Sequence, residues 1–82
     1  MIWVTHANYA GAYRLNLTFS DGTEGEVDLQ EIIANDPRPI FKELRNIDLF
    51  KKFRVDMDTI VWDNGLDLAP EFLYDQAHMM AR

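Results

Sequence analysis

Residues 13–29 contain the feature that most constrains the fold, an alternation of apolar and polar side chains on both sides of a short Ser-Asp-Gly segment. Such alternation is typical of two antiparallel strands that share one buried face. A two-residue loop would place Leu17 opposite a glutamate, whereas a three-residue loop pairs Leu15 with Val27 and keeps the apolar side chains together. We therefore predict the three-residue loop, with Gly22 in the left-handed position of a bulge. The same register pairs Phe19 with Thr23, Tyr13 with Leu29 and Arg14 with Asp28.

Further strands are predicted on both sides of this hairpin. Residues 2–8 are rich in β-formers and are predicted to precede it as a third antiparallel strand, joined through a short connection over residues 9–12. Residues 53–57 and 59–62 are predicted to form a second hairpin. Within it, pairing Val55 with Ile60 and Phe53 with Trp62 aligns large side chains on one face.

Short helical segments fill the rest of the chain. Ile32 and Ile33 give a helical stripe that ends at Asn35-Asp36-Pro37, and Pro39 suits the start of another turn. Asp48 is predicted to cap a further turn through residues 49–51. Pro70 and Glu71 are typical of the first turn of a helix, and the inward stripe of this last helix is Leu73, Ala77 and Met80.

These elements predict the α+β class. The expected architecture is an antiparallel sheet, made of a three-stranded meander plus a hairpin from the second half, with the short helices and the C-terminal helix on one face. The length of 82 residues predicts one domain over residues 1–82. There is no cysteine, no signal peptide and no apolar run near the roughly 20 residues that span a bilayer, so we expect a cytoplasmic protein without a membrane partner.

Charge is distributed unevenly along the chain. The net charge of −6 argues against a phosphate-binding surface. Residues 38–54 nevertheless carry six basic side chains against Glu43 and Asp48, while residues 55–75 carry six acids and no base. The basic segment is interpreted as a solvated helical face, with a docking patch for an acidic partner as the alternative. A nucleic-acid interface would use Arg38, Lys42, Arg45, Lys51, Lys52 and Arg54, and is not expected for this chain alone.

The stretch VWDNGLDLAPEFLYD, residues 61–75, is the most unusual part of the sequence. Asn64 and Gly65 adopt positive φ easily, so the first interpretation is a tight reversal that joins the last strand to the last helix. In this interpretation Asp63 and Asp67 bond nearby backbone N–H groups, and Trp62 packs beneath the helix.

Two chemical interpretations of the acidic residues are weaker. A calcium site built from Asp56, Asp58, Asp63 and Asp67 would need alternate oxygens around one loop, but the strand 59–62 places them at opposite ends of a hairpin. Acid–base catalysis by Glu24, Glu26 and Asp28 would need a desolvated pair, whereas these residues lie on the polar face of a strand. His6 and His78 have no second histidine at ligand spacing. We therefore predict no metal, no cofactor and no enzymatic activity.

The last helix offers a partner surface. Its apolar residues Phe72, Leu73, Ala77, Met79 and Met80, together with Tyr74, form a broader arc than one sheet face normally covers. The alternative is that Met79 and Met80 fray at the terminus.

Several motifs together resemble a known family. They are Phe19-Ser20-Asp21-Gly22-Thr23-Glu24-Gly25, Val27-Asp28-Leu29, Leu49-Phe50, Val61-Trp62, Asn64-Gly65, Asp67 and Ala69-Pro70-Glu71-Phe72-Leu73-Tyr74. The chain resembles, over nearly its whole length, the small bacterial proteins of the domain of unknown function 2442. Asp63 stands where such proteins often have proline. The resemblance implies no activity or cofactor, but it implies paired genes that look like toxin–antitoxin modules, and some members carry an additional helix-turn-helix domain.

The sequence therefore supports two hypotheses of different class. The first is a non-enzymatic protein-interaction module that binds a cognate small basic protein, as an antitoxin-like or accessory partner. The alternative is a small-molecule or ion-sensing domain that uses the loop 62–67. Self-association through an unpaired edge strand is compatible with both. The candidate residues, as partner surface or as structural motif, are Trp62, Asn64, Gly65, Asp67, Pro70, Glu71, Phe72 and Tyr74.

Overall fold

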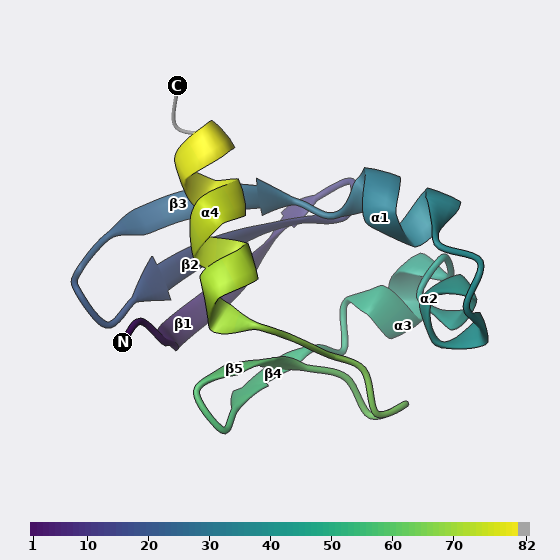
Figure 1. Cartoon of the computed structure of the whole chain (residues 1–82). Helices are drawn as coiled ribbons and strands as arrows, with labels where there is room; N and C mark the ends of the chain where they lie inside the picture. The colour runs from purple at the N-terminus through teal and green to yellow at the C-terminus, as the bar shows by residue number, and fades with distance from the viewer. Residues whose placement is uncertain (81–82) are drawn as a thin grey trace.

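Two three-stranded antiparallel sheets and four helices make up the part of the chain that the structure describes, an α+β arrangement (Figure 1). The computed structural model describes the backbone of residues 1–80 and the side chains of residues 1–77. The expectations for His78, Met79 and Met80 therefore lie outside the described side chains. The first sheet has the order β1-β2-β3, with β1 Val4–Gly11, β2 Arg14–Phe19 and β3 Glu24–Asp28. The second has the order β4-β5-β6, with β4 Arg54–Asp56, β5 Thr59–Val61 and β6 Asp67–Leu68.

The register of the central hairpin is the predicted one. Leu15 pairs with Val27 and Arg14 with Asp28, and the N–H of Phe19 donates to the carbonyl of Thr23 at 2.8 Å. Gly22 has φ +87°, as the bulge position of a three-residue loop requires.

β1 is longer than predicted, and its connection to β2 differs from the expected loop over residues 9–12. Tyr9 still pairs with Leu15, so the strand continues to Gly11. Ala12 and Tyr13 then make the turn with φ of 51° and 63°. A two-residue hairpin loop of this kind needs positive φ at both positions, which Asn and Gly favour. Alanine and tyrosine therefore do not indicate such a turn in the sequence.

The second sheet contains the predicted hairpin and one additional strand. Val55 pairs with Ile60 as predicted, but the ladder ends at the pair of Arg54 and Val61, so the expected pair of Phe53 and Trp62 is not part of it. β6 was not predicted, and it pairs with the other edge of β5. Val55 is also 38% exposed, and its strand β4 lies at the edge of the second sheet.

The helices are α1 Gln30–Asn35, α2 Pro39–Glu43, α3 Ile47–Phe50 and α4 Pro70–Met80. α3 is capped by Asn46, whose side chain accepts from the N–H of Asp48, rather than by Asp48 itself as expected. None of the described helices is long and apolar enough to traverse a bilayer.

The core lies where the apolar faces of the two sheets meet α4 and the short helices. α4 crosses the first sheet over β3, and α1, α2 and α3 gather beyond one end of that sheet (Figure 1). The close approach of α4 depends on Gly25, because a Cβ at that position would lie 2.8 Å from the Cβ of Ala77. The buried side chains include Leu15, Phe19, Val27, Phe50, Ile60, Trp62 and Leu73.

Candidate functional site

The segment after Trp62 is a hairpin loop between β5 and β6, and not the predicted connection from strand to helix. The N–H of Trp62 donates to the carbonyl of Leu66 at 2.9 Å, and the N–H of Gly65 donates to the carbonyl of Trp62 at 3.1 Å. Gly65 has φ +95°. The reversal is as tight as predicted, but it first returns the chain along β5 before α4 begins.

This loop has the same construction as the loop of the first hairpin. In each, an aromatic residue is followed by three loop residues, of which the second is Asp or Asn and the third is Gly. The side-chain Oδ1 of Asp21 accepts from the N–H of Thr23 at 2.9 Å, and Oδ1 of Asn64 accepts from the N–H of Leu66 at 3.1 Å. The repeated geometry identifies a backbone function for both side chains.

Trp62 supports the loop from inside. It is 3% exposed, its indole N–H donates to the carbonyl of Phe50 at 2.9 Å, and its ring lies 5.7 Å from the Phe50 ring. It is therefore a core residue and not part of an accessible surface.

Asn64 joins the loop to α2. Its Nδ2 donates to the carbonyl of Ile40 at 3.0 Å and to Oε1 of Glu43 at 2.9 Å. Both ends of this amide are therefore used, one for the loop and one for the neighbouring helix.

The remaining candidate residues lie away from this contact. Gly65 occupies the bend and Asp67 lies exposed in β6, while Pro70 and Glu71 begin α4. Phe72 and Tyr74 are half-buried and pack against the core. The motif thus divides between the β5–β6 loop and the first turns of α4.

Tyr74 connects α4 to the other hairpin loop. Its hydroxyl donates to Oδ2 of Asp21 at 2.8 Å, and its ring meets Phe19 edge-on at 5.0 Å. Hydrogen bonds from the Thr23 N–H and from Tyr74 lower the pKa of Asp21, and the bond to Asp21 raises the pKa of Tyr74.

The aspartates do not converge. Asp56 and Asp58 lie at the β4–β5 turn, whereas Asp63 and Asp67 lie at the other end of β5. Asp63 forms an ion pair with Arg54. Among the described residues, no group of three or more acidic or histidine side chains could hold a metal ion.

The acids of β3 line the polar side of the first sheet, away from the core. Glu26 forms an ion pair with Arg14 at 3.2 Å, and Glu24 is exposed. His6 contacts the hydroxyl of Thr5 through Nδ1 at 3.2 Å. The described side chains therefore do not place a histidine beside these carboxylates in a cavity.

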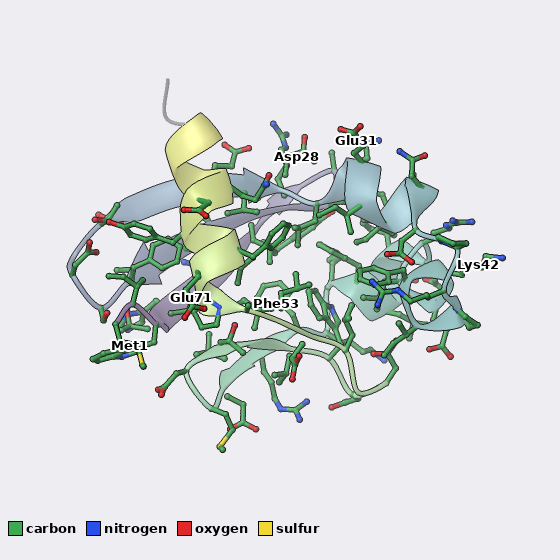
Figure 2. All side chains as sticks on the ribbon, in the orientation of Figure 1. Met1, Asp28, Glu31, Lys42, Phe53 and Glu71 are labelled. Atoms are coloured by element: carbon green, nitrogen blue, oxygen red, sulfur yellow. The ribbon has the colours of Figure 1, made fainter. Side chains whose placement is uncertain are left out.

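Most of the basic segment has structural partners. Arg38 pairs with Asp36 at 2.8 Å and Arg45 donates to the carbonyls of Ile33 and Ala34 at 2.9 and 2.7 Å. Arg54 pairs with Asp63, and Lys51 lies 5.4 Å from the centre of the Tyr9 ring. In the described part of the chain, Lys42 and Lys52 have no such partner, and Lys42 projects from the periphery in Figure 2.

A small hollow lies beside the candidate loop. It has a volume of about 200 Å³ and is lined by Glu43, Leu44, Leu49, Lys52, Trp62, Asp63 and Asn64. Leu44 and Trp62 form buried walls, and the side chain of Leu49 is exposed at its edge.

Sequence reasoning missed an apolar surface at the β4–β5 turn. Trp3, Val55 and Met57, which we call the hairpin patch, line one shallow hollow and are 41%, 38% and 87% exposed. The patch joins the N-terminal segment to the turn, since the N–H of Val4 donates to the carbonyl of Asp58 at 2.9 Å. The sequence feature that could have indicated this surface is the methionine between the two aspartates of the turn Asp-Met-Asp.

Comparisons with known proteins place the fold. No curated protein matches the chain significantly. A crystal structure from Nitrosomonas europaea ATCC 19718, named "Putative DNA Binding Protein", superposes with a TM-score of 0.83 at 20% sequence identity. The match covers 99% of this chain and 52% of that protein, so this chain spans about half of its length and shares its fold. The family described as protein of unknown function (DUF2442) matches residues 4–79, and the chain belongs to that family.

Proposed function

We propose that this chain is a non-enzymatic protein-interaction domain and that its partner, a small basic protein, docks on the hairpin patch. The observation that carries the proposal is the gathering of exposed apolar side chains at one end of the molecule. The large hydrophobic residues that the structure describes as exposed are Met1, Trp3, Leu49, Val55 and Met57. Three of them share one hollow, and Met1 is two residues from Trp3, on the same side of the view as the β4–β5 turn (Figures 1 and 2).

The backbone at this patch supports a functional cause. Met57 and Asp58 form the two-residue loop between β4 and β5 with φ of 51° and 71°. Asn and Gly are the residues that this turn favours, and a methionine there is strained by about 1–3 kcal/mol without gaining burial. An exposed residue in an unfavourable backbone conformation does not stabilise the fold, and this is a reason to look for a function at that position.

The charge around the patch supports a basic partner. Asp56 and Asp58 lie beside Met57 and line the same hollow, and the whole chain carries −6. A partner with basic side chains around an apolar anchor would be attracted to this surface and would associate faster at low salt. The paired genes implied by the family resemblance make the neighbouring gene product the first candidate, with this chain as its antitoxin-like or accessory partner.

The test is co-expression with the product of the neighbouring gene, followed by size-exclusion chromatography. The informative variant is Met57→Asn, because asparagine tolerates the left-handed turn and removes the apolar side chain without weakening the fold. We expect co-elution of the wild type, loss of co-elution for this variant, and an unfolding midpoint no lower than that of the wild type. Leu49→Asn is the matched control, since it removes an exposed apolar residue elsewhere and should still co-elute. Separate elution of the two wild-type proteins would overturn the proposal.

A further inference from the structure

We propose that the outer edge of β3 takes up a strand of another protein, in which basic and apolar side chains alternate, as a fourth strand of the first sheet. β3 is the outermost strand on one side of that sheet, and β1, on the other side, contacts the second sheet that carries the hairpin patch (Figure 1). Binding at this edge therefore does not require a partner on the patch.

The register shows which backbone groups of β3 are free. The N–H of Phe19 donates to the carbonyl of Thr23 at 2.8 Å, and the N–H of Leu29 donates to the carbonyl of Tyr13 at 3.0 Å. Backbone groups point to alternate sides along a strand, so the odd-numbered residues of β3 bond to β2 and the even-numbered ones face outwards. The outward residues are Glu24, Glu26 and Asp28. In the described part of the chain their backbone N–H and C=O groups have no protein hydrogen-bond partner, as strand addition requires.

The other strand edges are shorter or partly occupied. β4 has three residues and β6 has two, whereas β3 has five. On β1, the N–H of Val4 already donates to the carbonyl of Asp58 at 2.9 Å, and the second sheet lies against this strand. β3 is therefore the edge that best accommodates a further strand.

α4 extends past this edge. Its residue Ala77 lies against Gly25, where a Cβ on the glycine would come to 2.8 Å from that of the alanine. The helix continues to Met80, and three further residues at about 1.5 Å each advance it by about 4.5 Å. Neighbouring strands lie about 4.8 Å apart, so the last turn of α4 reaches over the position of a fourth strand (Figure 1). The side chains of that strand that face α4 should therefore be apolar.

Acidic side chains accompany the free backbone groups on the outer face. Glu24 is exposed and has no ion pair among the described residues, whereas Glu26 pairs with Arg14 at 3.2 Å. Asp28 and Glu31 line one hollow and project on the same side of the molecule (Figure 2). Arg14 thus compensates one of four acids, and the charge in excess along this edge is negative.

The remaining charged group of that hollow does not change this balance. Asp36 also lines it, but its carboxylate is paired with Arg38 at 2.8 Å. Basic side chains on the outer face of an added strand would therefore form favourable pairs with β3.

A second copy of this chain does not suit the edge. Two antiparallel β3 strands would bond through the outward groups of both, so in every register a Glu or Asp of one copy would lie opposite a Glu or Asp of the other. Like charges in directly opposite positions destabilise a strand pair. The occupant that the edge favours is therefore a basic strand of a different protein.

The probe is a capped peptide of alternating lysine and valine, long enough to span β3. We expect saturable binding at millimolar concentration in the NMR spectrum of the full chain. The amide hydrogens of Glu24, Glu26 and Asp28 should exchange more slowly in the complex, whereas those of Gly25 and Val27, which already face β2, should not change. This alternation is specific to an added strand, because ion pairing alone does not protect backbone N–H groups.

Two N-methylated peptides of equal charge test the geometry. In the expected pairing the lysines lie opposite the outward acids and exchange backbone hydrogen bonds with them. N-methylation of the lysines should therefore abolish binding, whereas N-methylation of the valines, whose N–H groups point away from β3, should not. A peptide of alternating glutamate and valine should not bind.

Two double variants separate the acids of β3 from general electrostatics. Glu24→Gln/Asp28→Asn should weaken binding of the lysine peptide about fivefold, because it removes two opposite-charge pairs. Asp67→Asn/Glu71→Gln removes two exposed acids elsewhere and should leave the affinity nearly unchanged.

Four results would overturn the proposal. They are the absence of saturable binding, protection that does not alternate along β3, equal binding of the two N-methylated peptides, and equal effects of the two double variants. The same protection of β3 on raising the protein concentration without peptide would show a second copy at the edge, and it would overturn the proposal as well.

Discussion

Asp21 and Asn64 occupy equivalent positions in the two three-residue hairpin loops, yet one is an acid and the other an amide. Both side chains accept a hydrogen bond from the backbone N–H two residues later. They differ in the other terminal atom of the side chain. Oδ2 of Asp21 accepts from the hydroxyl of Tyr74, whereas Nδ2 of Asn64 donates to α2. Each residue type is therefore determined by its tertiary partner and not by the turn.

Replacing the amide by an acid at one position, and the acid by an amide at the other, gives the first prediction. Asn64→Asp keeps the acceptor for the loop but loses both donated bonds, and it sets a carboxylate against that of Glu43. We expect a loss of about 1–2 kcal/mol in the free energy of unfolding, measured by urea denaturation. Asp21→Asn is the matched control and should cost less, because its new amide faces a hydroxyl that can also accept. An equal loss for both would contradict a role for the amide of Asn64 in joining the loop to α2.

Asp36 gives a prediction on acid stability. Hydrogen bonds from the Arg38 side chain and backbone lower the pKa of Asp36 to about 2. Because the folded pKa lies below the unfolded value of about 3.9, its contribution to stability is complete above that value and is lost as the pH falls towards 2. The free energy of unfolding of Asp36→Asn should therefore fall less steeply than that of the wild type between about pH 4 and pH 2.

Arg38→Gln tests the cause of that shift. It removes the side chain whose hydrogen bonds lower the pKa of Asp36, while leaving the carboxylate in place. Its acid dependence should lie between those of the wild type and Asp36→Asn, because the hydrogen bond from the backbone N–H of residue 38 to Asp36 remains. An unchanged slope in both variants would show that this pair does not contribute to acid stability.

At the scale of the elements, β3 and α4 approach each other through a pair of small residues. Gly25 lies on the inner face of β3 opposite Leu17, in a position where alternation alone would favour a larger apolar residue. Adding a Cβ there would bring it to 2.8 Å from the Cβ of Ala77, so Gly25→Ala should cost about 1–3 kcal/mol by overpacking. Thermal or urea unfolding would measure this loss.

A double-mutant cycle distinguishes a clash from a general intolerance of β3. Ala77→Gly should by itself cost about 1 kcal/mol through the lower helix propensity of glycine. The double variant should be more stable than the sum of the two losses predicts, because the second substitution makes room for the first. Strict additivity would mean that the two residues are not coupled.

The elements also show which parts of the fold the sequence determines locally. The register of the first hairpin was predictable because a charged residue would otherwise face the core, and Val55 and Ile60 pair as predicted. β6 was not predicted, because a strand of two residues is too short to show an alternation of apolar and polar side chains. The same loop rule that placed Gly22 applies to Gly65, so Asn64-Gly65 between Trp62 and Leu66 was the available signal. The positions of Asn64 against α2 and of Tyr74 against Asp21 join residues distant in sequence, and no local pattern encodes them.

At the scale of the whole molecule, the two sheets form a compact body. The radius of gyration is 11.8 Å, close to the roughly 12 Å that a compact domain of this length has. In Figure 1 the second sheet lies beneath the first, and α4 leaves the second sheet to cross the first. This path explains why the loop 62–67 and the start of α4 form one sequence motif although they contact different parts of the core.

The distribution of charge over this body leads to the last prediction. Four of the six basic residues of segment 38–54 are engaged by carboxylates, carbonyls or an aromatic ring, which leaves Lys42 and Lys52 free among those that the structure describes. Two free cations against a net charge of −6 give little gain from the release of counterions by DNA. We expect this chain to bind a labelled duplex more weakly than about 0.1 mM at physiological salt, measured by fluorescence anisotropy. Any binding at low salt should disappear in the variant Lys42→Gln/Lys52→Gln. Micromolar binding that survives this double substitution would contradict the prediction and would show that the engaged arginines leave their partners for DNA.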